Sequence, residues 1–123
     1  MTDKRVDAYE LYISAWSAIS DEERLRRLRA SVAQAIIFRN AMKTRNSLAD
    51  VVEHLEAFQK RSPGGSFRLM SMLGFENQGL ATWKFFDAEG QGGFSGFDAL
   101  TFDEEGRISY ILMFSDLEKQ RLK

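Results

Sequence analysis

The spacing of apolar residues changes near the middle of the chain. In the first half they recur every three to four positions, which predicts amphipathic helices. The first predicted helix covers residues 7–19, and a second begins at the capping-box pair Ser20 and Glu23. A third begins at Ser47 and ends at the Pro-Gly-Gly segment of residues 63–65. The apolar side of the first helix is predicted to comprise Ala8, Leu11, Tyr12, Ala15, Trp16 and Ile19.

The second half shows the two-residue period of β-strands. Strands are predicted over residues 67–73, 80–86, 93–102 and 107–114. The last three are joined by short acidic segments that end in glycine, as in tight hairpins. One earlier strand is predicted within residues 34–40, where four apolar residues run together, and a polar bend over residues 42–46 follows it.

This order of elements predicts an α+β fold. Three N-terminal helices pack on one face of a mostly antiparallel sheet, in a single domain of residues 1–123. The strands at 67–73 and 107–114 carry apolar side chains on both pleat faces. A sheet covered by helices on one side normally exposes polar groups on the other. We therefore expect the second face to bind another copy of the chain, as in a homodimer.

Composition and charge narrow the classes of function. The chain has 123 residues, of which 44% are hydrophobic and 28% charged, as expected for a folded protein with its own core. Its 17 basic and 18 acidic residues give a net charge of −1, so we expect no nucleic-acid partner. No apolar run is long enough to span a membrane, and residues 1–5 do not resemble the start of a signal peptide. We expect no membrane partner and a cytoplasmic location.

The residue types also argue against several kinds of site. The chain has one histidine and no cysteine, which disfavours a metal centre. It has no nucleophile-elbow motif, and none of its glycine pairs precedes a helix as in a phosphate-binding loop. We therefore expect neither a metal nor another cofactor.

Asp98 is the first candidate for chemistry. Alternation places it on the same strand face as Gly96, Leu100 and Phe102, so it has bulky apolar neighbours whichever face meets the helices. Burial raises the pKa of such a carboxyl and suits it to donate or accept a proton. The alternative is a structural aspartate bonded to backbone or to an arginine such as Arg39.

Four other side chains are candidates for a pocket. His54 borders the apolar side of the third helix, either as a half-buried structural residue or as an acid or base. Trp83 alternates with Lys84 and is expected to point inward, as pocket wall or as core. Tyr12 and Trp16 are one helical turn apart; they pack in the core, or the tyrosine hydroxyl reaches into a cavity.

Arginines are dense at residues 24–29. Asp21, Glu22 and Glu23 balance them, which favours a solvated helix face over a binding patch. Arg107, which follows an acidic turn, is expected to form a surface ion pair.

Taken together, these features resemble the nuclear transport factor 2-like superfamily and its SnoaL-like branch. The resemblance rests on the helix order, Trp16, the boundary at residues 63–67, Trp83, the Gly-Phe-Asp segment at 96–98 and the Gly-Arg-Ile segment at 106–108. It covers residues 9–116 and implies a strongly curved sheet that forms a cone with the helices, a cystatin-like architecture. It also implies a homodimer through the outer sheet face and a ligand pocket inside the cone.

Some such proteins are isomerases, cyclases, dehydratases or epoxide hydrolases, and others are binding modules without catalysis. In the ketosteroid isomerases an aspartate base follows the first short strand, where this chain has Asn40. An amide cannot act as that base. Cyclases and epoxide hydrolases use a carboxylate on the last strand, but residues 110–114 contain none and Asp116 lies beyond them.

The sequence therefore predicts a homodimer that binds a small, largely apolar molecule in an aromatic cone, with isomerase- or dehydratase-like proton transfer as the expected chemistry if it is an enzyme. The candidate catalytic residues are Asp98, His54 and Tyr12. The predicted pocket lining is Tyr12, Trp16, Phe38, Asn40, His54, Trp83 and Asp98. The alternative is a non-enzymatic dimerisation or protein-interaction module whose cone is filled with side chains.

Overall fold

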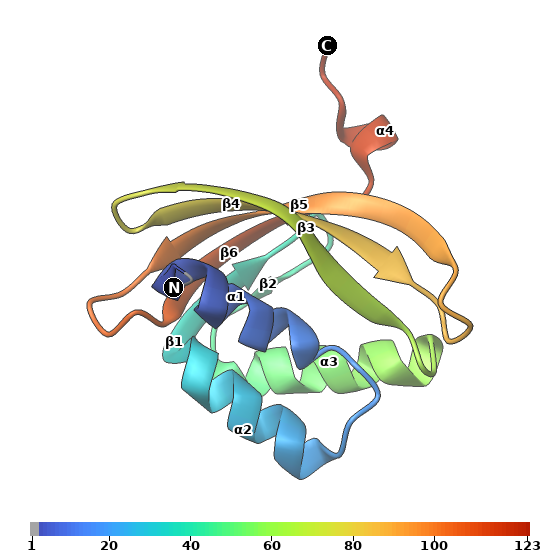
Figure 1. Cartoon of the computed structure of the whole chain (residues 1–123), viewed down its shortest axis with the longest axis horizontal. Helices are drawn as coiled ribbons and strands as arrows, with labels where there is room; N and C mark the ends of the chain where they lie inside the picture. Colours follow the sequence, from blue (N-terminus) through green and yellow to red (C-terminus); the bar gives the residue numbers. More distant parts are fainter. Residues whose placement is uncertain (1–2) are drawn as a thin grey trace.

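The computed structural model describes residues 3–123 (Figure 1). Its helices are α1 (Lys4–Ser14), α2 (Asp21–Ser31), α3 (Leu48–Arg61) and the short α4 (Leu117–Gln120). Its strands are β1 (Val32–Arg39), β2 (Thr44–Arg45), β3 (Ser66–Phe75), β4 (Gln78–Phe86), β5 (Gly92–Phe102) and β6 (Ile108–Phe114).

The six strands form one curled sheet in the order β2-β1-β6-β5-β4-β3. Strands β3 to β6 pair antiparallel with their sequence neighbours, as predicted for the meander. Strand β1 joins the sheet parallel to β6, a pairing of remote segments that the sequence pattern did not predict. Helices α1, α2 and α3 lie together beneath the hollow side of the sheet, while α4 and the C-terminus rise from the opposite side (Figure 1). The predicted α+β fold with a curved sheet is confirmed.

The first helix differs most from its prediction. It begins after Asp3, whose carboxylate accepts the backbone N–H of Arg5, and it ends at Ser14 instead of residue 19. Tyr12, Ala15 and Trp16 are buried as predicted and Ala8 packs against the core, but the buried side also includes Tyr9 and Ile13, so it is centred further round the helix than the predicted stripe. Burying the larger side chains removes more apolar surface from water than burying Ala8 and Leu11 would.

The elements around β1 also shift. The strand spans Val32–Arg39 instead of residues 34–40, and the predicted polar bend contains the two-residue strand β2. Phe38 pairs with Arg45 across this small hairpin. The short α4 was not predicted; Asp116 caps it by accepting the backbone N–H of Lys119.

The arginine-rich helix face agrees with the prediction except at Arg24. Glu23 pairs with Arg26 and Arg27, as expected for a solvated face. Arg24 is instead buried, and its guanidinium donates to the carbonyl oxygens of Ala15 at 2.9 Å and Ser17 at 2.8 Å. It satisfies carbonyls left open after α1 ends and so holds the α1–α2 connection.

The two faces of the sheet have different surroundings. On the inner face, side chains such as Ala81, Trp83, Leu100 and Ile111 are buried against the helices in one continuous core. On the opposite side, which we call the outer face, apolar side chains remain in contact with solvent. The outer face includes Leu73, Phe75, Leu80, Phe97 and Phe114.

Candidate functional site

Asp98 lies on the inner face of β5, and only 2% of its surface is exposed. Gly96, Leu100 and Phe102 share this buried face, as the alternation predicted. The carboxylate oxygen Oδ2 accepts a hydrogen bond of 2.7 Å from the hydroxyl of Tyr9 on α1. The structural alternative named backbone or an arginine such as Arg39 as the partner, but the structure gives a tyrosine 89 residues away instead.

The second oxygen of Asp98, Oδ1, is buried without a hydrogen-bond partner among residues 3–123. Burial raises the pKa of the Asp98 carboxyl to about 7, while the Tyr9 hydroxyl favours the charged form. The Trp83 indole also favours the charged form of Asp98. Near neutral pH the carboxyl therefore exists in both protonation states, so it can both donate and accept a proton.

A small recess lies beside this carboxyl. It is lined by Ile13, Trp16, Phe67, Trp83, Asp98 and Met113. Its volume is about 10 Å³, which is roughly the space of one water molecule. The recess therefore admits one polar atom, not a whole organic molecule, in this arrangement of the side chains.

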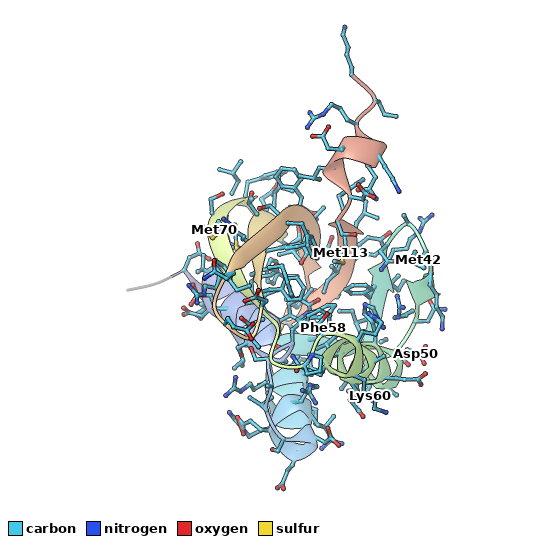
Figure 2. All side chains as sticks on the ribbon, turned by 90° about the vertical axis from the view of Figure 1, so that its right-hand side faces the viewer. Met42, Asp50, Phe58, Lys60, Met70 and Met113 are labelled. Atoms are coloured by element: carbon cyan, nitrogen blue, oxygen red, sulfur yellow. The ribbon has the colours of Figure 1, made fainter. Side chains whose placement is uncertain are left out.

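Aromatic rings fill the rest of the cone. Trp16 lies at the centre of this cluster. The centroid of its ring is 5.2 Å from the ring centroids of His54 and Phe58 and 5.1 Å from that of Phe67. The cluster continues through Phe85 to Phe94, which is half exposed at the rim. Figure 2 looks into this end of the cone and shows Phe58 of α3 and Met113 of β6 near its middle.

A close contact with Gly96 positions Trp83. The two residues face each other across β4 and β5, and a Cβ atom at position 96 would overlap the indole ring and the carbonyl oxygen of Phe114. Only glycine leaves this space, so the indole can lie flat against β5 beside Asp98. Trp83 points inward, as predicted.

Sequence reasoning left Ile13, Phe67 and Met113 out of the predicted lining, and it missed Tyr9, the hydrogen-bond partner of Asp98. Tyr9 is fully buried, three residues before Tyr12, and their rings are 5.6 Å apart. Burial, followed by the Asp98 charge, raises the pKa of both hydroxyls well above its usual value, so both remain protonated donors. The signal that could have found Tyr9 was its helical spacing: Tyr9, Tyr12 and Trp16 fall on one side of a helix.

Trp16 provides a second unsatisfied polar atom. Its indole nitrogen Nε1 is buried and makes no hydrogen bond within residues 3–123. The recess is thus bordered by one residue with a free donor, Trp16, and one with a free acceptor, Asp98. Unsatisfied buried polar atoms cost free energy, so a group that bonds to them here is stabilised.

His54 and Phe38 pack against Trp16 and do not line the recess. The ring centroids of His54 and Phe38 are 5.3 Å apart. Burial, with the nearby charges of Arg45, Arg61 and Lys43, lowers the pKa of His54 to about 4. The imidazole is therefore neutral at pH 7.

The structure does not bring Asn40 to the recess. Its side-chain oxygen accepts the backbone N–H groups of Met42 and Lys43, each at 3.0 Å. The amide thus closes the β1–β2 turn, which is a common structural role for asparagine. Of the seven predicted pocket residues, Trp16, Trp83 and Asp98 border the recess directly. Tyr12 packs beside Tyr9 and close to the Asp98 charge.

Residues 3–123 lack two features that would point to particular kinds of function. They contain no group of three or more histidine, cysteine, aspartate or glutamate side chains placed to hold a metal ion. None of the helices in the same range has the length and apolar character needed to cross a membrane.

Comparison with solved structures places this fold among known ones. A proposed isomerase of the SnoaL-like family from Agrobacterium tumefaciens strain C58 superposes with a TM-score of 0.83 at 21% identity, covering 92% of this chain and 97% of that one. A proposed SnoaL-like polyketide cyclase from Jannaschia sp. CCS1 gives 0.77 at 11% identity, with 95% and 88% covered. An NTF2-like protein of unknown function from Cytophaga hutchinsonii gives 0.69 at 12% identity, with 98% and 96% covered.

No protein-family model and no curated protein matches the sequence. The similarity is therefore one of fold. The chain has the cone-shaped fold of NTF2-like and SnoaL-like proteins, as the sequence resemblance implied.

Proposed function

We propose that this protein binds a small, largely apolar molecule inside the cone and that one oxygen atom of this molecule occupies the recess beside Asp98. The observation that carries the proposal is the buried carboxyl whose Oδ1 has no partner within residues 3–123, next to space for one polar atom. A ligand hydroxyl bonds both to this oxygen and to the indole N–H of Trp16. The surrounding aromatic rings suit the apolar remainder of the molecule.

The chemistry best suited to this site is proton transfer next to a carbonyl group. In its charged form Asp98 accepts a proton from the carbon next to the carbonyl group, while the electron pair of the broken C–H bond moves toward the carbonyl oxygen and the indole N–H of Trp16 donates to the developing oxyanion. The carboxyl, now neutral, then returns the proton to a carbon of the molecule and regains its charge. Tyr12 and Tyr9 keep their protons, and the hydroxyl of Tyr9 already bonds to Asp98. His54 is one ring further away and has the role of neutral pocket wall in this proposal.

Binding of a whole molecule requires aromatic side chains to move, because the recess has a volume of only about 10 Å³. The path to solvent leads through the rings of Phe67, Phe85 and Phe94, the last of which is half exposed. Rotation of these side chains opens the cone without any change in the strands. The free energy needed for this rotation reduces the apparent affinity.

We also propose that the outer face forms a homodimer. Leu73 is 70% exposed and Phe75 67% exposed, and a groove lined by Leu80, Phe97 and Phe114 runs beside α4. An apolar surface that extends over several strands is typical of an interface between protein chains. A second copy of the same face is complementary in hydrophobic character, as in a two-fold dimer.

The neutral ketone 2-tetralone tests both binding and chemistry. We expect saturable shifts of the two tryptophan indole N–H signals in NMR titrations, because Trp16 and Trp83 both line the recess. In D₂O we expect the protein to accelerate exchange of the protons next to the carbonyl group, and Asp98→Asn to remove most of that acceleration. The outer-face variant Leu80→Ala is the control and leaves both results unchanged.

The second candidate function is a dimerisation or interaction module with a permanently filled cone, which the small volume of the recess favours. If 2-tetralone at millimolar concentration shifts neither indole signal, the ligand-binding proposal fails and this second function is supported. Binding together with exchange that is unaffected by Asp98→Asn excludes Asp98 as the acid or base.

A further inference from the structure

Three basic side chains close to the cone have no ion-pair partner within residues 3–123. They are Lys43 and Arg45 of the β1–β2 hairpin and Arg61 at the end of α3. By contrast, Glu23 alone pairs with two arginines on α2. All three positive charges act on His54 and lower its pKa. The cone therefore has a positively charged side that the net charge of the chain conceals.

Arg45 is the central residue of this group. Its guanidinium carbon lies 5.7 Å from the centre of the Phe38 ring, and its Nη1 atom is buried without an acceptor among the described residues. Burying a charged donor without a partner is costly. Asp50 and Glu53 favour the charged form of Arg45 from a distance, but neither pairs with it, and Asp50 accepts the backbone N–H of Asn46.

A continuous row of aromatic rings connects Arg45 with the recess. The guanidinium lies over Phe38, the Phe38 ring is 5.3 Å from that of His54, and His54 is 5.2 Å from Trp16, which lines the recess. His54 is neutral at pH 7 and adds no charge to this row. A molecule that displaces these packed rings, as the proposed ligand must, thus has a cationic group at one end and the Asp98 carboxyl at the other.

We propose that the ligand of the cone is an apolar molecule with a carboxylate at one end, and that Arg45 binds this carboxylate with Arg61 and Lys43 contributing positive charge. This inference rests on the proposed ligand-binding function and defines its substrate class. The planar guanidinium matches a carboxylate with two parallel hydrogen bonds, which would satisfy the buried Nη1 atom. The ligand oxygen at Asp98 and the carboxylate at Arg45 together determine which way the molecule lies.

A matched pair of probes tests the inference. 2-Naphthol has an apolar body and one hydroxyl, and 6-hydroxy-2-naphthoate adds a carboxylate at the far end. We expect the naphthoate to bind the wild-type protein at least tenfold more tightly at pH 7.5, followed by the indole N–H signals of Trp16 and Trp83. Arg45→Gln removes this preference and leaves the affinity for 2-naphthol within about twofold.

Arg68→Gln is the matched control, because Arg68 also lies over a phenylalanine ring, that of Phe86, at 4.0 Å. Its strand partner is Lys84, outside the cone. We expect this variant to keep the full preference for the naphthoate. Equal binding of both probes to wild-type protein, or a preference that survives Arg45→Gln, overturns the carboxylate inference but leaves the binding function standing. Failure of both probes to bind overturns both proposals.

Discussion

The two faces of the sheet are similar in sequence but differ in their surroundings. Leu100 on the inner face is 2% exposed, whereas Leu80 on the outer face of the neighbouring strand is 40% exposed. The inner face is covered by the helices of the same chain and contains the only aspartate that is buried among residues 3–123. Among residues 3–123, the outer face has no buried charged group, and the helix beside it is the four-residue α4. Apolar alternation on both faces of a strand therefore does not tell which face is buried in the chain: the helices cover one face and leave the other in contact with solvent.

The largest expected effect comes from truncating one leucine on each face. Leu100→Ala leaves a cavity in the core and should lower the free energy of unfolding by about 2–5 kcal/mol. Leu80→Ala removes the same atoms from a partly exposed site and should cost less than about 1 kcal/mol in the monomer. Urea unfolding at low protein concentration measures both values. Equal losses would show that the two faces are equally buried in solution.

The next effect depends on pH and concerns the carboxyl on the inner face. The pKa of Asp98 is about 7 in the folded protein, above its ordinary value of 3.8. The folded state therefore binds the proton more tightly, and the stability contributed by Asp98 is complete below about pH 4 and lost as the pH rises through 7. Between these limits the slope is up to about 1.4 kcal/mol per pH unit.

The contribution of His54 to the free energy of unfolding has the opposite pH dependence. The pKa of His54 falls from 6.5 to about 4 on folding, so its contribution is present above pH 6.5 and lost as the pH falls through 4. We therefore expect a shallow pH profile for the wild-type protein and a profile for Asp98→Asn that rises with pH between 4 and 6.5. Unfolding measured at several pH values gives the difference between the two proteins. A difference that does not change with pH would contradict the raised pKa.

The smallest expected effect is on the affinity of dimerisation, and it distinguishes the outer face from the rest of the exposed surface. Leu80→Asp places a charge in the proposed dimer interface and should weaken dimerisation by at least tenfold, which corresponds to about 1.4 kcal/mol. Met42→Asp is the control, because Met42 is highly exposed in the β1–β2 turn, away from the outer face. Sedimentation at micromolar concentration measures the dimer fraction. A wild-type protein that remains monomeric there would refute the homodimer.

Much of the fold could be predicted because its signals are local. Ser20 and Ser47 cap their helices as their sequence neighbours indicated, and the glycine-ended turns join the strands of the meander. The two-residue period predicted the inward direction of Trp83 and the apolar neighbours of Asp98, but it left open which face of the Asp98 strand meets the helices. Errors arose where neighbouring helix positions could equally well face the core, as in α1, where Tyr9 is fully buried and Ala8 only half-buried.

The sequence by itself determined the order of the elements, the curved α+β class and the presence of a carboxyl on a buried strand face. Helix caps, turns and pleat alternation act over a few residues, so they can be read directly from neighbouring positions. Only the tertiary structure decided that Tyr9 bonds to Asp98, that the cone is filled with aromatic rings, and that Arg45 lies over Phe38 without an ion pair to any of the described residues. These contacts join segments far apart in the chain, and their geometry depends on how whole elements pack together.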